Sequence, residues 1–205
     1  MTGPYHLTEW FATPPALGYQ SAMTEDQPNP TATRILDIAE DGARTGGYAG
    51  FSFREIAKEI GIKPASVHYH FPAKADLATV LMRRYTDTLL AGLGNSEDAG
   101  QPADALLAAF VAEMRRRLAE EDLLCLGAVF GAECASLPLD VAAETRDFFA
   151  RVTRWLVPLF ARRGARDPEG AAMEFLARIH GAMIQSHAHG ALDVYDRIAA
   201  RALAR

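Results

Sequence analysis

The chain has few of the residues that would mark it as exported, disulfide-bonded or membrane-spanning. Its 205 residues include only two cysteines, Cys125 and Cys134, which do not make the disulfide framework of a small secreted domain. No apolar run approaches the roughly 18 residues that a transmembrane helix needs. The N-terminus also lacks the basic, apolar and small-residue segments of a secretory signal peptide. We therefore expect a cytoplasmic protein that does not associate with membranes.

A general excess of positive charge is also absent. Lys and Arg number 21 against 26 for Asp and Glu, a formal net charge of −5. The charge is uneven, however, because residues 61–75 contain Lys63 and Lys74 and no carboxylate. Such an acid-free patch in an acidic protein indicates a surface that binds a polyanion.

The sequence lacks the motifs of common enzymes and cofactor sites. It has no glycine-rich phosphate loop, no nucleophile elbow and no metal-ligand motif. His180, His187 and His189 lie late in one predicted helix, but no two of them are four residues apart. We interpret them as polar residues of a helix edge or dimer interface. We expect no catalytic residues, no metal and no cofactor.

Helical periodicity dominates what is present. From residue 31 onward, apolar residues recur at amphipathic-helix spacing, and we find no strand pattern and no internal repeat. Residues 1–28 are proline-rich and show no such period, so we predict an irregular arm there. The expected fold class is all-α, with a linker over 91–101 and helices at about 35–46, 53–60, 64–69, 74–90, 103–122, 123–136, 138–163, 169–189 and 191–204.

Two short helices with a glycine, Gly61, in the turn between them are typical of a helix-turn-helix. In the second helix we expect Val67 to face inward. The small or polar Ala65, Ser66 and His68 would face outward and let the helix enter the major groove of DNA. The pattern alone also fits a small helical bundle with an inert polar surface.

The run Ser52–Lys74 (SFREIAKEIGIKPASVHYHFPAK) resembles the DNA-binding segment of the TetR family of repressors. Its most specific part is Tyr69–Phe71 together with Lys74. The resemblance covers about residues 29–90. It implies a TetR-type helix-turn-helix domain over 29–90, with the motif at about 52–71, and an effector-binding and dimerisation domain over 91–205.

The resemblance also implies the partners. We expect a homodimer that binds a pseudo-palindromic operator in double-stranded DNA and is released from it by a small-molecule effector. The last two helices would pair with those of a second chain. We interpret an apolar face in this region as the surface that the dimer buries: Phe175, Leu176, Ile179, Met183 and Ile184.

We expect Ser66 and His68 to contact bases, and the cationic or hydrogen-bonding residues around them to contact phosphates. The complete expected set of DNA-binding residues is Ser52, Arg54, Lys63, Pro64, Ala65, Ser66, His68, Tyr69, His70 and Lys74.

Three features depart from the family pattern. Gly42 and Ala43 replace a bulky pair late in the first helix, which predicts a thinner core there. Lys63 and Ala73 stand where the family has N-cap residues, and each change is expected to weaken a cap by ~1 kcal/mol.

The segment from Cys125 to Cys134 resembles a subgroup of these repressors in which some members respond to electrophiles through a cysteine at the position of Cys125. This implies an alternative function, a thiol-gated repressor in which the Cys125 thiolate is the nucleophile. The other interpretation is that both cysteines are small buried apolar residues.

Aromatic and methionine side chains of the second half are candidates for an effector pocket, although such residues also form ordinary cores. We interpret Arg115–Arg117 as a solvated face. A helical scaffold protein remains a third possibility, but it would not explain the acid-free patch. The expected pocket residues are Phe110, Met114, Cys125, Phe130, Phe149, Trp155, Phe175 and Met183.

Overall fold

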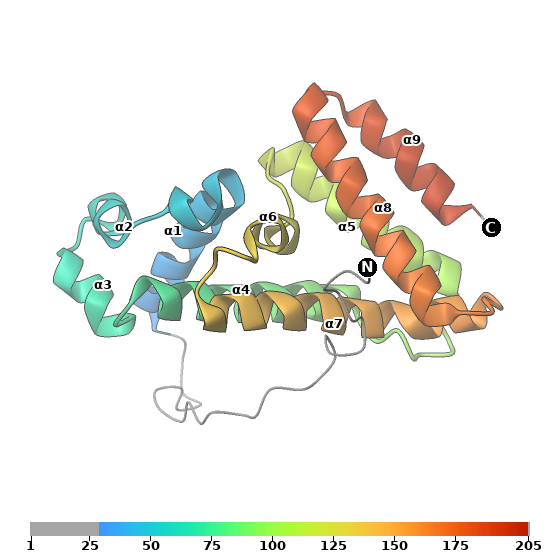
Figure 1. Ribbon diagram of the computed structural model, residues 1–205, viewed down its shortest axis with the longest axis horizontal. Coiled ribbons are helices and arrows are strands. Elements are labelled where there is room, and N and C mark those ends of the chain that lie inside the picture. Colours follow the sequence, from blue (N-terminus) through green and yellow to red (C-terminus); the bar gives the residue numbers. More distant parts are fainter. Residues whose placement is uncertain (1–28, 205) are drawn as a thin grey trace, which may run out of the picture.

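The computed structural model describes residues 29–204, and all regular secondary structure in that range is helical (Figure 1). The predicted arm over 1–28 lies outside the described residues. In chain order the elements are α1 (Pro30–Gly46), the short 3₁₀ helix η2 (Gly47–Gly50), α2 (Phe53–Ile60), α3 (Pro64–His70), α4 (Lys74–Leu93), α5 (Ala103–Glu121), α6 (Leu126–Glu133), α7 (Leu139–Arg162), α8 (Pro168–His189) and α9 (Leu192–Leu203).

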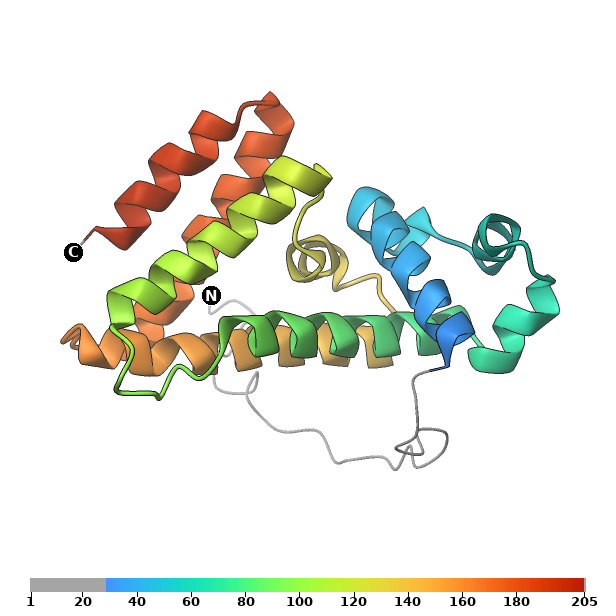
Figure 2. The ribbon, with the colours of Figure 1, turned by 180° about the vertical axis from the view of Figure 1, so that it is seen from behind.

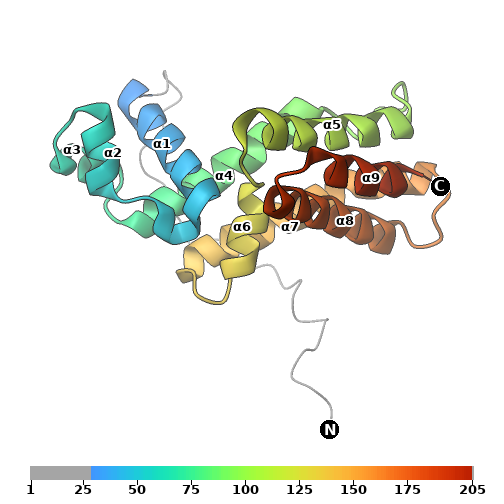
Figure 3. The same cartoon turned by 90° about the horizontal axis from the view of Figure 1, so that it is seen from above.

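Two long helices, α4 and α7, lie side by side along the length of the molecule (Figures 1 and 2). Helices α1–α3 gather at one end, and α5, α8 and α9 cover the other. The short helix α6 lies between these two groups, in contact with α1, η2 and α7 (Figure 3). A structural change near α6 can therefore affect both groups of helices.

Local sequence signals explain the helix-turn-helix. The Ser52 hydroxyl accepts a hydrogen bond from the Glu55 N–H and so caps α2. Gly61 ends that helix with φ of 81°, a left-handed conformation that glycine adopts without strain. Ile56 and Val67 are fully buried against α1, so the two helices are held by a small apolar core.

The small residues Gly42 and Ala43 allow α1 and η2 to pack closely together. A Cβ atom at position 42 would lie 2.6 Å from the carbonyl oxygen of Gly50, and Ala43 is completely buried. Large side chains would force the two segments apart. The small pair therefore produces closer packing rather than the thin core that the sequence suggested.

The weak cap at Ala73 is partly compensated. The Asp76 carboxylate accepts a hydrogen bond of 2.9 Å from the Ala73 N–H at the start of α4. At Lys63, by contrast, no side chain caps α3, and Pro64 at its first position removes one N–H that would need a partner.

Two boundaries differ from the prediction. Helix α4 continues to Leu93, into the expected linker, whereas α6 covers only eight residues of the expected helix over 123–136. Asp122 ends α5 in a left-handed conformation with φ of 52°, and the chain runs without helix to Cys125. The apolar residues at the start of the expected helix therefore belong to a non-helical connection that packs against the core.

The apolar face predicted for the dimer is mostly used inside the chain itself. Phe175, Leu176, Ile179 and Met183 are at most 4% exposed and belong to the chain's own hydrophobic core. Of that predicted face, Ile184 alone is exposed, at 47%. The prediction that the whole face is free for a second chain was therefore wrong, because α5 and α7 already cover it.

Within residues 29–204, we find no helix with the length and apolar character needed to span a bilayer.

Candidate nucleic-acid interface

Helix α3 lies at one extreme of the molecule and presents a free face (Figures 1 and 3). Tyr69 is 84% exposed, and Ala65, four residues earlier on the same face, is also exposed. Val67 on the opposite side is completely buried and fixes the rotation of the helix. The result is a short helix whose outward surface consists of small and polar groups.

Positively charged side chains of the N-terminal helices lie around α3. The only three lysines of the sequence are Lys58, Lys63 and Lys74. Lys58 and Lys63 are exposed, as is Arg54 on α2. A nucleic-acid backbone placed along α3 would therefore meet positive charge on both sides of it.

His68, expected to contact bases, is held on the flank of α3. Its ring packs edge-on against Phe53 at a centroid distance of 4.6 Å, and its Nδ1 lies 3.2 Å from the carbonyl oxygen of Pro72. Ser66 is partly exposed on the other flank. Ala65, Ser66 and Tyr69 therefore define the centre of the outward face.

Lys74 is positioned by two aromatic rings. Its Nζ lies 4.7 Å from the ring centre of Tyr48 and 4.5 Å from that of Phe51. Burial lowers the pKa of Lys74, and the nearby carboxylates of Glu55 and Glu133 act in the opposite direction. The ammonium group is thus fixed at the N-terminus of α4, where exposed N–H groups also attract anions.

The remaining expected DNA-binding residues fall into two groups. The Ser52 hydroxyl is already used to cap α2, since it accepts a hydrogen bond from the Glu55 N–H and donates one of 2.7 Å to the Glu55 carboxylate. Pro64 is exposed at the start of α3, and His70 is partly buried beside Tyr69, with a ring-centroid distance of 5.2 Å.

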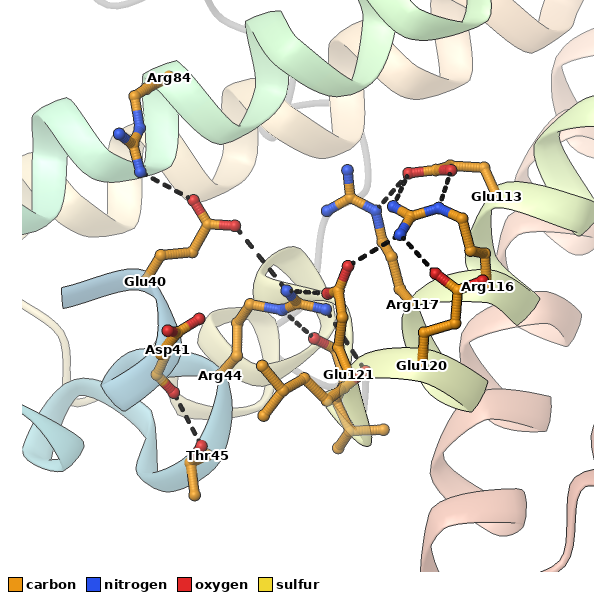
Figure 4. Close-up of polar contacts among 12 residues, drawn as sticks. Glu40, Asp41, Arg44, Thr45, Arg84, Glu113, Arg116, Arg117, Glu120 and Glu121 are labelled. Atoms are coloured by element: carbon orange, nitrogen blue, oxygen red, sulfur yellow. Dashed lines mark hydrogen bonds and ion pairs between the residues drawn. The ribbon is translucent and has the colours of Figure 1, made fainter. Parts of the chain in front are cut away.

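Arg44 connects these N-terminal helices to the α5–α6 connection (Figure 4). Its Nε donates to the carbonyl oxygen of Leu124 at 2.8 Å, and its Nη1 donates to Glu121 at 2.5 Å. A second link joins η2 to α6, where the Tyr48 N–H donates to the Glu133 carboxylate at 2.8 Å. Neither link was predicted from the sequence, because no local pattern pairs residues so far apart in the chain.

A further set of ion pairs joins α1, α4 and α5. Arg84 on α4 donates to Glu40 at 3.1 Å (Figure 4) and also to Asp37 at 2.8 Å, both on α1. On α5, the Arg117 Nε donates to Glu113 at 2.7 Å. Arg117 is buried over the Tyr85 ring, so the prediction that Arg115–Arg117 form a solvated face was wrong for this residue.

Cys125 is completely buried at the start of α6, beside two polar side chains. Tyr85 Oη and His180 Nε2 are both buried and interact with the Cys125 thiol, and both rings pack against Phe148. Burial raises the pKa of the Cys125 thiol, but the charge of His180, with contributions from Tyr85 and the Ala128 N–H, outweighs it and lowers this pKa to about 6. The Cys125 thiol is thus buried, yet its ionised form is favoured.

The expected effector-pocket residues divide into two groups within the core. Phe110 packs against Trp155 and Phe175, with ring-centroid distances of 6.2 and 5.9 Å. Phe149 instead packs against His180, one of the two polar residues beside Cys125. The other members, Met114, Phe130 and Met183, are fully buried.

The three histidines have separate surroundings. His180 is buried between the aromatic rings of Phe148 and Phe149, so its interpretation as a helix-edge or interface residue was wrong. The His187 Nδ1 is 3.5 Å from the Asp122 carboxylate. In the described part of the chain, we find no group of three His, Cys, Asp or Glu side chains arranged to hold a metal ion.

An exposed, positively flanked second helix behind a glycine turn defines a helix-turn-helix DNA-binding protein. Residues 35–81 match the family described as bacterial regulatory proteins, tetR family. A TetR-family transcriptional regulator from Agrobacterium tumefaciens is 30% identical, with a TM-score of 0.79 over 84% of this chain and 95% of that one. A TetR regulator from Legionella pneumophila is 27% identical, with a TM-score of 0.79 over 86% and 97% of the two chains.

The chain belongs to the TetR family of transcriptional regulators, which bind DNA and catalyse no reaction. The reduced form of E. coli NemR, at 17% identity and a TM-score of 0.73 over 84% of this chain and 95% of that one, shares the fold. A search of curated protein sequences found no significant match.

Proposed function

We propose that the chain is a homodimeric repressor that binds a pseudo-palindromic operator in double-stranded DNA and is released by a small-molecule effector. The observation that carries this proposal is the outward face of α3. Its exposed Ala65 and Tyr69 lie opposite the buried Val67, so the helix can enter a groove without exposing the core. In the proposed complex, Ser66 and the exposed edge of His68 contact bases.

The proposed phosphate contacts come from Arg54, Lys63, Tyr69, His70 and Lys74. Two observations support these contacts. The five residues lie around α3, and the Lys74 ammonium is held at the start of α4 by the Tyr48 and Phe51 rings. Such contacts set orientation and affinity but carry no sequence information.

The proposed dimer uses the exposed strip that remains on α8 and the neighbouring part of α9. Met173 and Ile184 on α8 are about half exposed, and Leu192 and Ile198 on α9 are partly exposed. Two-fold pairing through this strip would present two copies of α3 to one face of the duplex. The expected spacing of the half-sites is about 34–36 Å, one helical turn of DNA.

The proposal is tested by titrating the protein into labelled DNA from upstream of its own gene while following fluorescence anisotropy. The expected result is saturable binding of one dimer per site that weakens steeply with salt. Equal affinity for this DNA and for a scrambled duplex of the same length contradicts sequence-specific binding.

A second candidate function is a repressor gated by the Cys125 thiol, and the buried Tyr85 and His180 beside this thiol favour it because they stabilise the thiolate. In the proposed step the thiolate sulfur forms a bond to the β-carbon of a Michael acceptor, the carbon–carbon π bond breaks, and the α-carbon then takes a proton from solvent. Because Cys125 is completely buried, the added group can be accommodated only if the surrounding segment moves. Because Leu124 precedes Cys125 and accepts a hydrogen bond from Arg44, displacement of this segment would loosen the N-terminal helices.

The thiol-gated candidate is tested with N-ethylmaleimide, using mass spectrometry for the adduct and anisotropy for release from DNA. Release that is retained in the Cys134→Ser variant and lost in Cys125→Ser supports it. Release that persists in Cys125→Ser, or an adduct on Cys125 without release, contradicts it.

A further inference from the structure

The carboxylate of Glu133, the last residue of α6, lies against η2, just before the helix-turn-helix. It accepts a hydrogen bond of 2.8 Å from the Tyr48 N–H. The main chain at Glu133 is itself fixed, because its carbonyl oxygen accepts hydrogen bonds from both the N–H and the hydroxyl of Ser136. The Glu133 carboxylate therefore extends from a fixed backbone and can hold η2 in one place.

The backbone of η2 leaves room for this carboxylate. Gly47 is buried and has φ of 67°, a conformation that glycine adopts without strain. A Cβ atom at position 47 would overlap the Glu133 carboxylate, since it would lie only 2.6 Å from the Glu133 Cδ. The close fit at Gly47 and the hydrogen bond from Tyr48 are two separate contacts that keep Glu133 on η2.

Tyr48 connects this contact to Lys74. The Tyr48 ring packs edge-on against Phe130 of α6 and against Phe51, with ring-centroid distances of 6.4 and 6.1 Å. The Lys74 ammonium lies over the Tyr48 and Phe51 rings, and Lys74 remains partly exposed. Because Glu133 holds the backbone of Tyr48 and the Tyr48 ring holds Lys74, one continuous series of contacts runs from α6 to the start of α4.

We propose that Glu133 is a positioning residue for DNA binding, which acts through Tyr48 to hold the Lys74 ammonium where it can neutralise a phosphate of the operator. The phosphate contact rests on the proposed function, whereas the position of Lys74 is measured without DNA. A lysine side chain loses rotamer entropy when it is fixed. Because Lys74 is fixed when the protein folds, less of this entropy is lost when DNA binds.

The charge of Glu133 and its position have separate effects on Lys74. The Glu133 carboxylate raises the pKa of Lys74, as does Glu55, while burial lowers it. Glu133→Gln removes the charge but keeps an oxygen that can accept the Tyr48 N–H. Glu133→Asp keeps the charge but is one methylene shorter, so it cannot reach Tyr48 in the same geometry. These two variants therefore distinguish positioning from charge.

NMR spectroscopy of the DNA-free protein measures the position of Lys74. The sequence has only three lysines, so selective ¹³C labelling of lysine gives three resolved positions for the Cε–Hε signals. We expect the signal that is lost in Lys74→Ala to lie upfield of the other two, because two aromatic rings shield its protons. In Glu133→Ala this signal is expected to move downfield, towards the other two. An unmoved Lys74 signal in Glu133→Ala overturns the proposal.

The conservative variants assign the cause. We expect the Lys74 signal of Glu133→Gln to match that of the parent protein, and the signal of Glu133→Asp to shift as in Glu133→Ala. The opposite order overturns positioning, because the effect would then follow the charge. Glu133→Asp is the smallest of these changes and decides the question if Glu133→Ala does not fold. Glu120→Ala removes the same charge from an exposed position on α5 and is the control, with an unchanged Lys74 signal expected.

Anisotropy titrations with a labelled duplex test the role in DNA binding. Glu133→Ala is expected to bind severalfold more weakly than Glu133→Gln, although both lack the carboxylate charge. In the Lys74→Ala background the two substitutions are expected to give equal affinities, because Glu133 acts through Lys74.

Two results decide against this role. A difference between Glu133→Ala and Glu133→Gln that persists in the Lys74→Ala background overturns it, since a merely structural effect of Glu133 would not depend on Lys74. Equal DNA affinities of Glu133→Ala and Glu133→Gln in the presence of Lys74 also overturn it. A protein that binds no DNA at all contradicts the proposed function, while the NMR signal still decides whether Glu133 positions Lys74.

Discussion

Arg44 donates a hydrogen bond of 2.8 Å from its Nε to the carbonyl oxygen of Leu124, eighty residues further along the chain. The same guanidinium donates to Glu121, and its side chain is almost completely buried. One residue of α1 thus joins the DNA-binding helices to the connection between α5 and α6. Tyr48 and Glu133 make a second such link between η2 and α6.

Removing the Arg44 side chain is expected to destabilise the protein. In Arg44→Gln, the Leu124 carbonyl loses its charged donor, and the expected cost is about 1–3 kcal/mol in the free energy of unfolding. Urea denaturation followed by circular dichroism measures this difference. Arg34→Gln, at an exposed position of the same helix, is the control and is expected to change stability by less than ~0.5 kcal/mol. Equal stabilities of the two variants would show that the link contributes nothing.

Lys74 is expected to contribute affinity without contributing specificity. Replacing it in Lys74→Ala should weaken binding to operator and scrambled DNA alike, and should flatten the salt dependence by about 0.9 units because one phosphate is no longer neutralised. Anisotropy titrations at several salt concentrations measure the slope. Arg154→Ala, at an exposed position on α7, is expected to leave the slope unchanged. An unaltered slope in Lys74→Ala would remove Lys74 from the interface.

The exposed strip on α8 predicts where a charge will disturb the dimer. In Ile184→Glu, a carboxylate would be buried at the proposed two-fold interface, and dissociation to monomers is expected because desolvating an unpaired charge is costly. Analytical ultracentrifugation measures the mass. Leu139→Glu places the same charge on α7 at a residue that is 85% exposed, and this variant should remain dimeric. A dimeric Ile184→Glu protein would place the interface elsewhere.

The surroundings of Cys125 predict an unusual dependence on pH. Its pKa of about 6 in the folded protein lies below the value of about 8.5 for a free thiol. The thiolate therefore stabilises the fold fully above pH ~8.5, and this contribution is lost as the pH falls towards 6. The alkylation rate with iodoacetamide should also rise around pH 6 rather than near 8.5.

His180→Gln tests the cause of this shift. Without the imidazole, only Tyr85 and the Ala128 N–H oppose the effect of burial on the thiol pKa, so the inflection of the alkylation rate should move to higher pH. Cys125→Ser, which retains Cys134, supplies the background rate. A profile that is identical in the parent protein and in His180→Gln would contradict the assigned role of His180.

Much of the helix-turn-helix could be predicted because its signals are local. The Ser52 cap, the turn at Gly61 and the inward Val67 each depend on neighbours within a few residues, and the structure has all three. Eight of the nine expected α-helices occur close to their predicted positions, and the ninth, α6, is shorter. The roles of the DNA-binding residues remain predictions.

The features that were missed depend on distant partners. Arg44 and Arg117 look like ordinary surface arginines in the sequence, and only the fold brings them to Leu124 and Tyr85. The apolar face of α8 was assigned to a second chain because periodicity shows that a face is buried but not what buries it. Phe175 and Met183 pack within the chain instead.

The outward face of α3 is the surface expected to enter DNA, and Ala65→Glu tests this most directly. Ala65 is exposed in the first turn of α3, where a carboxylate favours the helix dipole, so stability should be retained or slightly raised. Ala108→Glu, at an exposed position on α5, is the control. Anisotropy titration is expected to show loss of DNA binding in Ala65→Glu and unchanged binding in Ala108→Glu. Binding of DNA by Ala65→Glu with the affinity of the parent protein would contradict the central claim.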